Sequence, residues 1–519
     1  MFEYIFGELK VKKVDYIALD INGLAYKIYI SLKTFEKVGL TNKTVPITII
    51  DAICGKGKTQ FSYQNIKDNI TQKFIYVTLY MSETQRLLNF CEREGIQIQT
   101  PKEIYDKNTK TKNKSNGLRV LLQQGSNIVM THELFKIING DVLNLIEKYD
   151  YVLYLDEVMD LIHPYRFLTG DLYLLLLNGI LSYDTQSKLL WKENYFDYYN
   201  KCMKESDSNY TSRKTTYVGV FNDLKAKCEN NSLYLFILEN KDNKTINLEL
   251  VYIFPPKIFT SFKHIYVLTY MFEAQLQSVY FKLILNEYEL KTVSYNINLD
   301  RYELKDYDVE EAKQEFNSYK NLMNIYQGKY NDIGKKTNYS YTYLHKCDLK
   351  SINKIMRNIK ERIWKVGTEE ILWTTIKGNK DENIKKELSK QGFKSNFIPM
   401  NMRATNDYKY KTHLMYIYNR YMKPDLKMLF KTELNEDIYA LSDLVQWVFR
   451  SAIRDNKPIN LFLPSERMRG LIDNSDFFFD LMYKQYIEKQ EYIKNKRIYI
   501  LPTIVRVIWG VLAFCYGAG

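Results

Sequence analysis

A glycine-rich turn near the start of the chain carries the residue types that bind phosphate. Residues 51–60 read Asp-Ala-Ile-Cys-Gly-Lys-Gly-Lys-Thr-Gln, and they follow the β-prone run Val-Pro-Ile-Thr-Ile-Ile of residues 45–50. Glycines let a loop curl until several backbone N–H groups face one phosphate, a lysine adds charge, and a threonine hydroxyl binds Mg²⁺. The alternative is a solvated basic turn. The preceding strand favours a site for ATP and Mg²⁺, formed by Gly55, Lys56, Gly57, Lys58 and Thr59.

A pair of acids later in the chain supplies the complementary chemistry. Residues 151–157 read Tyr-Val-Leu-Tyr-Leu-Asp-Glu, an apolar run that ends in two carboxylates. At an ATP site we expect Asp156 to hold Mg²⁺ through water and Glu157 to orient and deprotonate the attacking water. The alternative is that both acids cap a helix over residues 158–162.

A phosphate loop also needs a cation opposite the γ-phosphate. In the second half of the chain Gln446, Arg450 and Arg454 recur at every fourth residue, so a helix would place them on one face. Apolar residues fall on another face of the same segment, at Leu444, Val448 and Ala452. We therefore expect the glutamine and the two arginines to complete the catalytic set. The alternative is an ordinary amphipathic helix with surface arginines.

The elements that must position these residues alternate between strand and helix. Apolar strands are expected at residues 47–50, 74–79, 127–130 and 151–155, each followed by polar residues and then helical periodicity. This pattern predicts a doubly wound parallel sheet, which binds ligands at the carboxyl ends of its strands. Four residues fall at those ends, namely Gly55, Thr78, Thr131 and Asp156.

A second series of strands indicates a second sheet. Strands are expected at residues 264–270, 371–376 and 459–463, after a junction near residue 255. The predicted fold class is α/β, with two P-loop-type domains in tandem whose parallel sheets are flanked by helices, after a short antiparallel β segment. The expected division is 1–44 for that segment, 45–250 and 251–475 for the two sheet domains, and 476–519 for an apolar C-terminal tail.

Composition bounds the function classes. The chain has 519 residues, 45% of them hydrophobic and 15% aromatic, which supports two or three folded domains and argues against long disordered tracts. A formal net charge of +13 favours polyanions such as nucleic acid, although a lysine-rich composition also contributes to it. The six cysteines are scattered, which predicts a reducing cytoplasm and no structural zinc.

The two ends of the chain lack clear targeting signals. Acids at Glu3 and Glu8 interrupt the N-terminus, which is therefore not expected to be a secretory signal. Residues 498–516 are almost wholly apolar but include Pro502 and Arg506, so a buried element is favoured over a membrane anchor.

The first 38 residues resemble a known DNA-binding family. Residues 1–7, Met-Phe-Glu-Tyr-Ile-Phe-Gly, and 20–26, Asp-Ile-Asn-Gly-Leu-Ala-Tyr, resemble the opening of RuvA, the Holliday-junction-binding subunit of a branch-migration helicase. The resemblance implies the beginning of an OB-fold that contacts junction DNA. It covers about half of that barrel.

Residues from about 45 to 475 resemble helicase superfamily 2, the DEAD/DEAH-like helicases, in a phage-borne form. The phosphate loop at 52–59 resembles its first motif, residues 155–157 its second, residues 402–406 its fifth and residues 446–454 its sixth. The resemblance implies tandem RecA-like domains with ATP between them. It also implies phosphate contacts to single-stranded or branched nucleic acid, from Thr78, Thr131, Arg403 and Thr405.

The expected function is that of an ATP-dependent helicase or translocase that acts on DNA in phage replication or recombination. RNA stays open as a substrate, and replication or recombination proteins are the expected partners. Two alternatives stay open. One is a Holliday-junction or other DNA-binding module without motor activity. The other is a packaging-type ATPase, which would need a cluster of carboxylates for two metals in the second half.

Overall fold

The computed structural model describes most of the chain. The described residues are 8–12, 16–21, 24–29, 45–106, 111–138, 140–184, 187–192, 221–230, 232–239, 246–285, 288–331, 337–376, 382–400, 407–423, 426–427 and 434–484.

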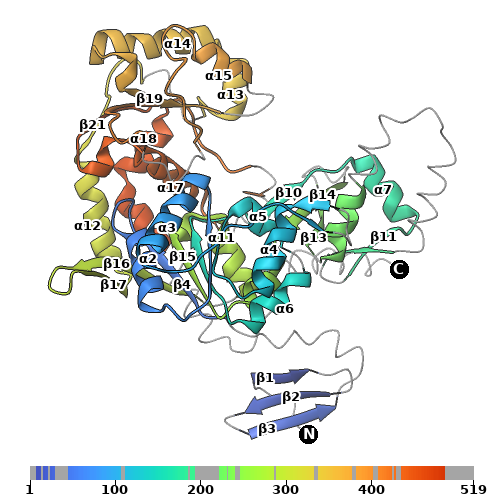
Figure 1. Ribbon diagram of the computed structural model, residues 1–519. Helices are drawn as coiled ribbons and strands as arrows, with labels where there is room; N and C mark the ends of the chain where they lie inside the picture. The colour runs from blue at the N-terminus through green and yellow to red at the C-terminus, as the bar shows by residue number, and fades with distance from the viewer. Residues whose placement is uncertain are drawn as a thin grey trace.

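A seven-stranded sheet organises the first large domain (Figure 1). Its spatial order is β17 (Arg301–Asp306), β16 (Glu289–Asn296), β4 (Ile47–Asp51), β15 (His264–Thr269), β9 (Val152–Asp156), β5 (Phe74–Thr78) and β8 (Ile128–Thr131). All neighbouring strands are parallel except the β16–β17 hairpin at one edge. The central strands β4, β5 and β9 are buried on both faces, which explains why their sequences are continuous apolar runs.

Helices cover both faces of this sheet. One face packs against α2 (Lys58–Asp68) and α3 (Met81–Arg93) through a cluster that includes Tyr63, Leu87 and Tyr154. The opposite face packs against α4 (Lys114–Gln123), α5 (His132–Lys136), α6 (Gly140–Lys148) and α11 (Leu276–Tyr280). Because β4, β15 and β9 are parallel neighbours, their carboxyl ends lie at one edge of the sheet.

A second sheet of four parallel strands forms the other large domain. Its order is β18 (Met323–Ile325), β21 (Ile459–Phe462), β20 (His413–Tyr416) and β19 (Ile371–Thr374). Its helices include α12 (Val309–Lys320), α13 (Tyr341–Lys346), α14 (Leu349–Asn358), α15 (Glu382–Leu388), α17 (Glu436–Val448) and α18 (Glu466–Asp473). The predicted fold class, two α/β domains in tandem with helices flanking parallel sheets, is confirmed.

The predicted boundary between the domains at residues 250 and 251 is wrong. β15, which was expected to begin the second sheet, lies between β4 and β9 in the first, and β16 and β17 extend that sheet further. The second domain instead begins at α12. A strand's pattern of apolar residues shows that it is buried in a sheet but does not show which sheet it joins.

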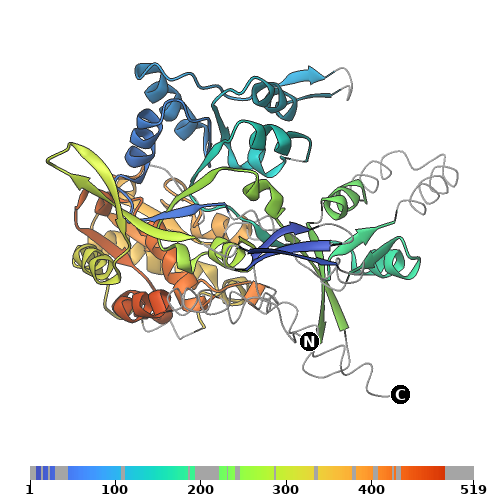
Figure 2. The same ribbon diagram turned by 90° about the horizontal axis from the view of Figure 1, so that it is seen from below.

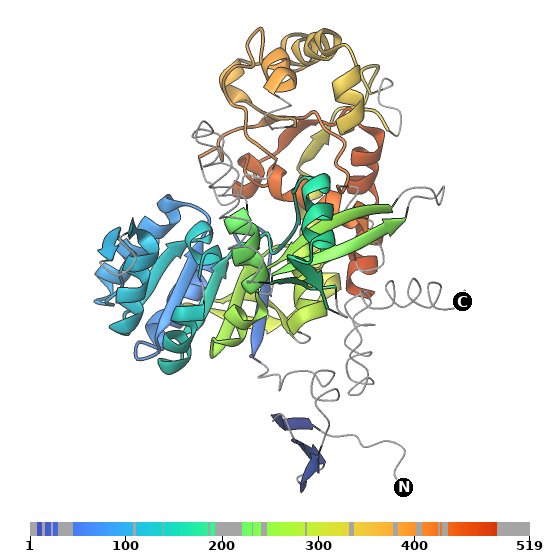
Figure 3. The ribbon, with the colours of Figure 1, turned by 90° about the vertical axis from the view of Figure 1, so that its right-hand side faces the viewer.

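The described residues from β10 to β14, between β9 and β15 in the chain, form an arm beside the first sheet (Figure 3). Its antiparallel strands are β10 (Ile162–Tyr165), β14 (Ile246–Ile253) and β13 (Leu233–Glu239), with the pair β11 (Leu181–Tyr183) and β12 (Leu189–Trp191) and helix α7 (Thr169–Leu177). This insertion explains why β15 follows its sheet neighbour β9 only after a long interval of sequence.

A small antiparallel sheet of its own precedes the first domain. It consists of β1 (Glu8–Lys12), β2 (Tyr16–Ile21) and β3 (Leu24–Tyr29), drawn in the darkest blue in Figure 2. The expected antiparallel β segment is confirmed, although residues 1–7 lie outside the described residues. Residues 485–519, with most of the predicted tail, also lie outside them. Across the part of the chain that is described, no helix has the length and apolar character needed to cross a membrane.

Candidate nucleotide site

The glycine turn folds as a loop between β4 and the first turn of α2. Gly55 and Gly57 have backbone φ angles of 96° and 105°, which residues other than glycine rarely adopt. The ammonium group of Lys58 donates hydrogen bonds to the main-chain carbonyls of Ala52 and, at 3.2 Å, Ile53. The loop therefore has the strand, turn and helix context that phosphate binding requires.

The acid pair stands at the end of β9. Asp156 is 9% exposed, and Glu157 has a φ of 75° that is unusual for a residue with a side chain. The Glu157 N–H donates a 2.9 Å hydrogen bond to the Leu268 carbonyl on β15, which fixes this strained backbone. Among the described residues, Glu157 Oε2 is buried without a hydrogen-bond partner. The alternative in which the acids cap a helix is wrong, because residues 158–161 have no helical structure and lead into β10.

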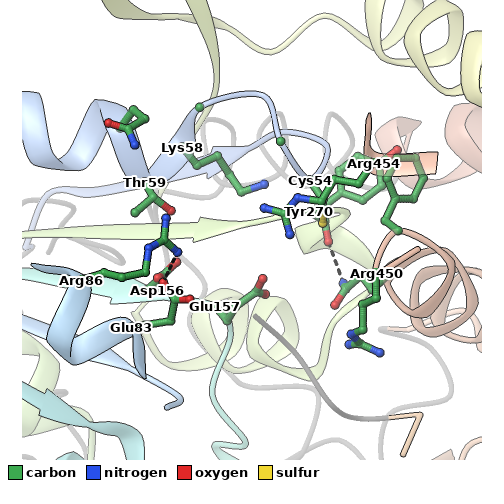
Figure 4. Close-up of a pocket in the computed structure, with 15 residues that line it drawn as sticks. Cys54, Lys58, Thr59, Glu83, Arg86, Asp156, Glu157, Tyr270, Arg450 and Arg454 are labelled. Atoms are coloured by element: carbon green, nitrogen blue, oxygen red, sulfur yellow. Dashed lines mark hydrogen bonds and ion pairs between the residues drawn. The ribbon is translucent and has the colours of Figure 1, made fainter. Parts of the chain in front are cut away.

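One cavity of about 210 Å³ joins these groups to the second domain (Figure 4). Its walls come from the loop, β9, α3, the end of β15 and the segment that follows α17. The lining residues are Cys54, Gly55, Gly57, Lys58, Thr59, Gln60, Glu83, Arg86, Asp156, Glu157, Tyr270, Gln446, Phe449, Arg450 and Arg454. Lys56 is the one predicted loop residue outside this lining, because its ammonium group forms a 2.5 Å ion pair with Glu315 on α12.

The glutamine and the two arginines reach the cavity, but not from one helix face as predicted. α17 ends at Val448, and Arg454 lies in a separate 3₁₀ turn, η5 (Ala452–Asp455). Gln446 Nε2 donates a 3.0 Å hydrogen bond to the Tyr270 carbonyl of the first domain. Arg450 is 4% exposed, and its Nη1 lies 3.5 Å from the Met400 carbonyl.

Arg454 lies directly against the phosphate loop. A Cβ atom placed on Gly55 would be 3.7 Å from Arg454 Cγ, so the two domains come close together at this point and an added methyl group would just fit between them. The arginine and the loop thus approach the same cavity from opposite domains, as Figure 4 shows.

Burial controls the charge of two carboxyls near the loop. Burial raises the pKa of Asp156 to about 7, with further increases from the neighbouring Glu157 and Glu83 and a decrease from Lys58. Burial likewise raises the pKa of Asp51 to about 6, opposed by hydrogen bonds from the backbone N–H groups of Phe272 and Met271. A carboxyl such as Asp156 that is crowded by other acids favours binding a cation, and this is consistent with a Mg²⁺ ligand.

Comparisons with known proteins decide the family. A model of the YonV C-terminal Rossmann-like domain matches residues 317–475. The SPbeta prophage-derived protein YonV of Bacillus subtilis is 31% identical over 437 residues, which cover 82% of this chain and 97% of that protein. The chain belongs to the YonV family.

Other matches concern smaller parts of this YonV-family chain or its fold. A model of the RuvA N-terminal domain matches residues 1–53, and the RuvA subunit of the Holliday junction branch migration complex from Fusobacterium nucleatum is 51% identical over 43 residues, 8% of this chain and 22% of that protein. Among solved structures, Xpd4 of S. tokodaii is 13% identical with a TM-score of 0.35, covering 83% of this chain and 94% of that one. The helicase MrfA bound to DNA is 10% identical with a TM-score of 0.31, covering 84% and 46%.

Several cavity residues of this YonV-family protein were not singled out from its sequence. Glu83 and Arg86 form an ion pair on α3, the helix that follows β5. Their signal was available, because residues just beyond the carboxyl end of a neighbouring parallel strand reach the same sheet edge. Cys54, Gln60, Tyr270 and Phe449 enter the cavity through the path of the backbone, which no motif spacing indicates.

The residues predicted to contact nucleic acid differ in their exposure, and two of them are not described by the structure. Thr78 and Thr131 lie side by side at the ends of β5 and β8. Thr78 is fully buried in this structure, and its role as a nucleic-acid contact stays a prediction. Thr131 is partly exposed. Arg403 and Thr405 lie outside the described residues.

Proposed function

We propose that this chain is an ATP-dependent helicase or translocase that binds ATP and Mg²⁺ between its two α/β domains and acts on DNA. The observation that carries the proposal is the shared cavity, in which the phosphate loop and acid pair of one domain face Gln446 and two arginines of the other. A site divided between two domains links the state of the nucleotide to the distance between those domains.

Each side chain has a role that its position supports. Lys58 and the N–H groups at the start of α2 would hold the phosphates. Mg²⁺, held by Thr59 and Asp156, would neutralise charge on the phosphate oxygens. Glu157, with its carboxylate oxygen free of other partners among the described residues, would accept the proton of the attacking water. Arg454 would stabilise the charge that develops on the γ-phosphate.

Two further observations support DNA as the substrate. The net charge of +13 favours a polyanion. The N-terminal residues that match the RuvA domain model include β1, β2 and β3, and we propose that this small sheet contacts branched DNA.

The test is ATP turnover by the full chain with and without single-stranded DNA. We expect DNA to stimulate turnover in the parent, Lys58→Ala to lose nucleotide binding, and Glu157→Gln to bind ATP while turnover falls about a hundredfold or more. Lys67→Ala is the matched control, because Lys67 is an exposed lysine of the same helix that pairs with Glu94. A folded parent that does not hydrolyse ATP under either condition would contradict the proposal.

Two additional measurements separate the parts of the proposal. Release of a labelled strand from a duplex distinguishes a helicase from a translocase, which would hydrolyse ATP without releasing the strand. Removing residues 1–44 should weaken binding to a four-way DNA junction without changing ATP turnover on single-stranded DNA. Unchanged junction affinity would show that β1–β3 do not contact DNA.

A further inference from the structure

The hairpin at the edge of the first sheet is attached to the helix that begins at the phosphate loop. Gln64 on α2 donates a 2.9 Å hydrogen bond from Nε2 to the Tyr302 carbonyl, and its Oε1 accepts a 3.0 Å bond from the Tyr302 N–H. One residue earlier on β17, Arg301 pairs with Asp68 at 2.8 Å. These contacts fix the backbone of Tyr302 relative to α2.

This attachment places an aromatic ring on the phosphate loop. A Cβ atom on Gly57 would lie only 2.1 Å from Tyr302 Cε1, so the ring packs directly on the glycine. Gly57, Gln60 and Gln64 are spaced by three and four residues and share one face at the start of α2. The Tyr302 ring meets the first of these residues and the Tyr302 backbone bonds the third, and the second, Gln60, lines the cavity.

The position of the ring matches the end of the site where a nucleoside must emerge. In a phosphate loop the backbone N–H groups hold the α- and β-phosphates while the lysine reaches the β- and γ-phosphates. The acid pair and Arg454 mark the γ-phosphate end of this cavity, so the sugar and base leave from the other end, past Gln60.

Tyr302 stands outside the lining of the cavity, and the two aromatic rings that do line it, those of Tyr270 and Phe449, are poorly placed to meet a base. Tyr270 is 5% exposed and Phe449 is 1% exposed, so neither presents a free face. Tyr302 is partly exposed, and beside it Tyr295 is 48% exposed, with ring centroids 5.1 Å apart and planes at 57°. The two tyrosines thus form a partly exposed aromatic surface that reaches the loop at Gly57.

We propose that Tyr302 is the surface on which the base of the bound nucleotide stacks. The inference rests on the proposed function, and it adds a binding residue from a segment far from the loop in sequence. Stacking requires only the flat face that every base has. The N–H and carbonyl of Tyr302 are both bonded to Gln64 and do not read the edge of a base. Stacking on Tyr302 by itself therefore does not distinguish ATP from GTP.

The test compares a nucleotide with its phosphates alone. Affinities of the full chain for ATP and for inorganic tripolyphosphate are measured by calorimetry, in parent, Tyr302→Leu and Tyr302→Phe, each in the presence of Mg²⁺. Leucine keeps an apolar side chain against Gly57 but removes the ring. We expect Tyr302→Leu to weaken ATP about tenfold, as losing one stacked base does, and to leave tripolyphosphate within about twofold. Tyr302→Phe should bind both ligands as the parent does.

Each other outcome overturns a defined part of the argument. Equal weakening of ATP and tripolyphosphate by Tyr302→Leu would make the ring a support for the loop rather than a surface for the base. Unchanged ATP affinity, or an equal loss in Tyr302→Phe, would also overturn the stacking role. A parent that binds tripolyphosphate and hydrolyses ATP would in those cases keep its proposed function. A folded parent that binds neither ligand would overturn both proposals.

Discussion

Gln446 Nε2, on the last turn of α17, donates a 3.0 Å hydrogen bond to the main-chain carbonyl of Tyr270, just after β15. The bond is buried and crosses from the second domain to the first. A second buried bond runs beside it, from Gln275 Nε2 to Ser442 Oγ at 2.7 Å. Hydrogen bonds from two side-chain amides therefore connect the two walls of the nucleotide cavity.

Removing this link should reduce turnover more than nucleotide affinity. Gln446→Ala deletes a bond between domains but leaves the loop, so we expect kcat for ATP to fall about tenfold while the Kd for ATP changes less than about threefold. Leaving the Tyr270 carbonyl without this donor should also lower the free energy of unfolding by about 1–2 kcal/mol. Steady-state kinetics and urea unfolding measure the two effects, with the exposed Gln124→Ala as control. An equal loss of kcat and ATP affinity would show that Gln446 acts on the bound nucleotide itself.

The two arginines should differ in what they support. Arg454 lies against Gly55, so Arg454→Ala should lower kcat about a hundredfold or more, and Arg454→Lys should recover only part of it because lysine lacks the planar, forked donor. Arg450 is almost fully buried, so Arg450→Ala should mainly reduce stability, by about 2 kcal/mol. Single-turnover kinetics and thermal unfolding of each variant separate these effects. Normal turnover in Arg454→Ala would remove that residue from the catalytic set.

Two glycines with positive φ should respond differently to the same substitution. Gly57→Ala adds a methyl group that meets the Tyr302 ring, whereas at Gly95, with φ of 69°, nothing lies within 4 Å of an added Cβ. Gly95→Ala should cost about 1 kcal/mol of stability through backbone strain and leave ATP binding unchanged. Gly57→Ala should abolish measurable ATP binding, because the loop or the hairpin must move. Unchanged ATP affinity in Gly57→Ala would mean that the Tyr302 ring moves aside without disturbing the phosphate site.

The sequence was sufficient to predict that the glycine loop follows β4 and that the acid pair ends β9, because in each case a few adjacent residues determine the local structure. It also predicted the tandem α/β fold, since buried parallel strands are continuous apolar runs. The place of β15 could not be predicted, because it depends on pairing with β4 and β9 across the arm insertion. The arginine segment lines the cavity although its helix ends at Val448. The periodicity of the sequence did not reveal this end, or the 3₁₀ turn that begins four residues later.

Asp51 should make stability depend on pH. Its pKa is raised from 3.8 to about 6 in the folded chain, so its protonated form favours folding. This stabilisation is fully present below pH 3.8 and is lost as pH rises through 6, a change on the order of 3 kcal/mol for a shift of about two units. In Asp51→Asn the contribution should be absent, so the free energy of unfolding of the variant relative to the parent should increase between pH 4.5 and 7.5. Chemical unfolding across that range measures the difference. A constant difference would show that Asp51 keeps an ordinary pKa.

The route of the chain between the two domains has a practical consequence. Within the described residues the backbone passes from the first sheet to the second once, between Asp306 at the end of β17 and Val309 at the start of α12. The remaining ties are non-covalent, and they include the Gln446, Gln275 and Lys56 contacts. The protein is therefore suited to being divided at this junction into two co-expressed fragments, whose reassembly would report directly on how strongly the domains hold each other.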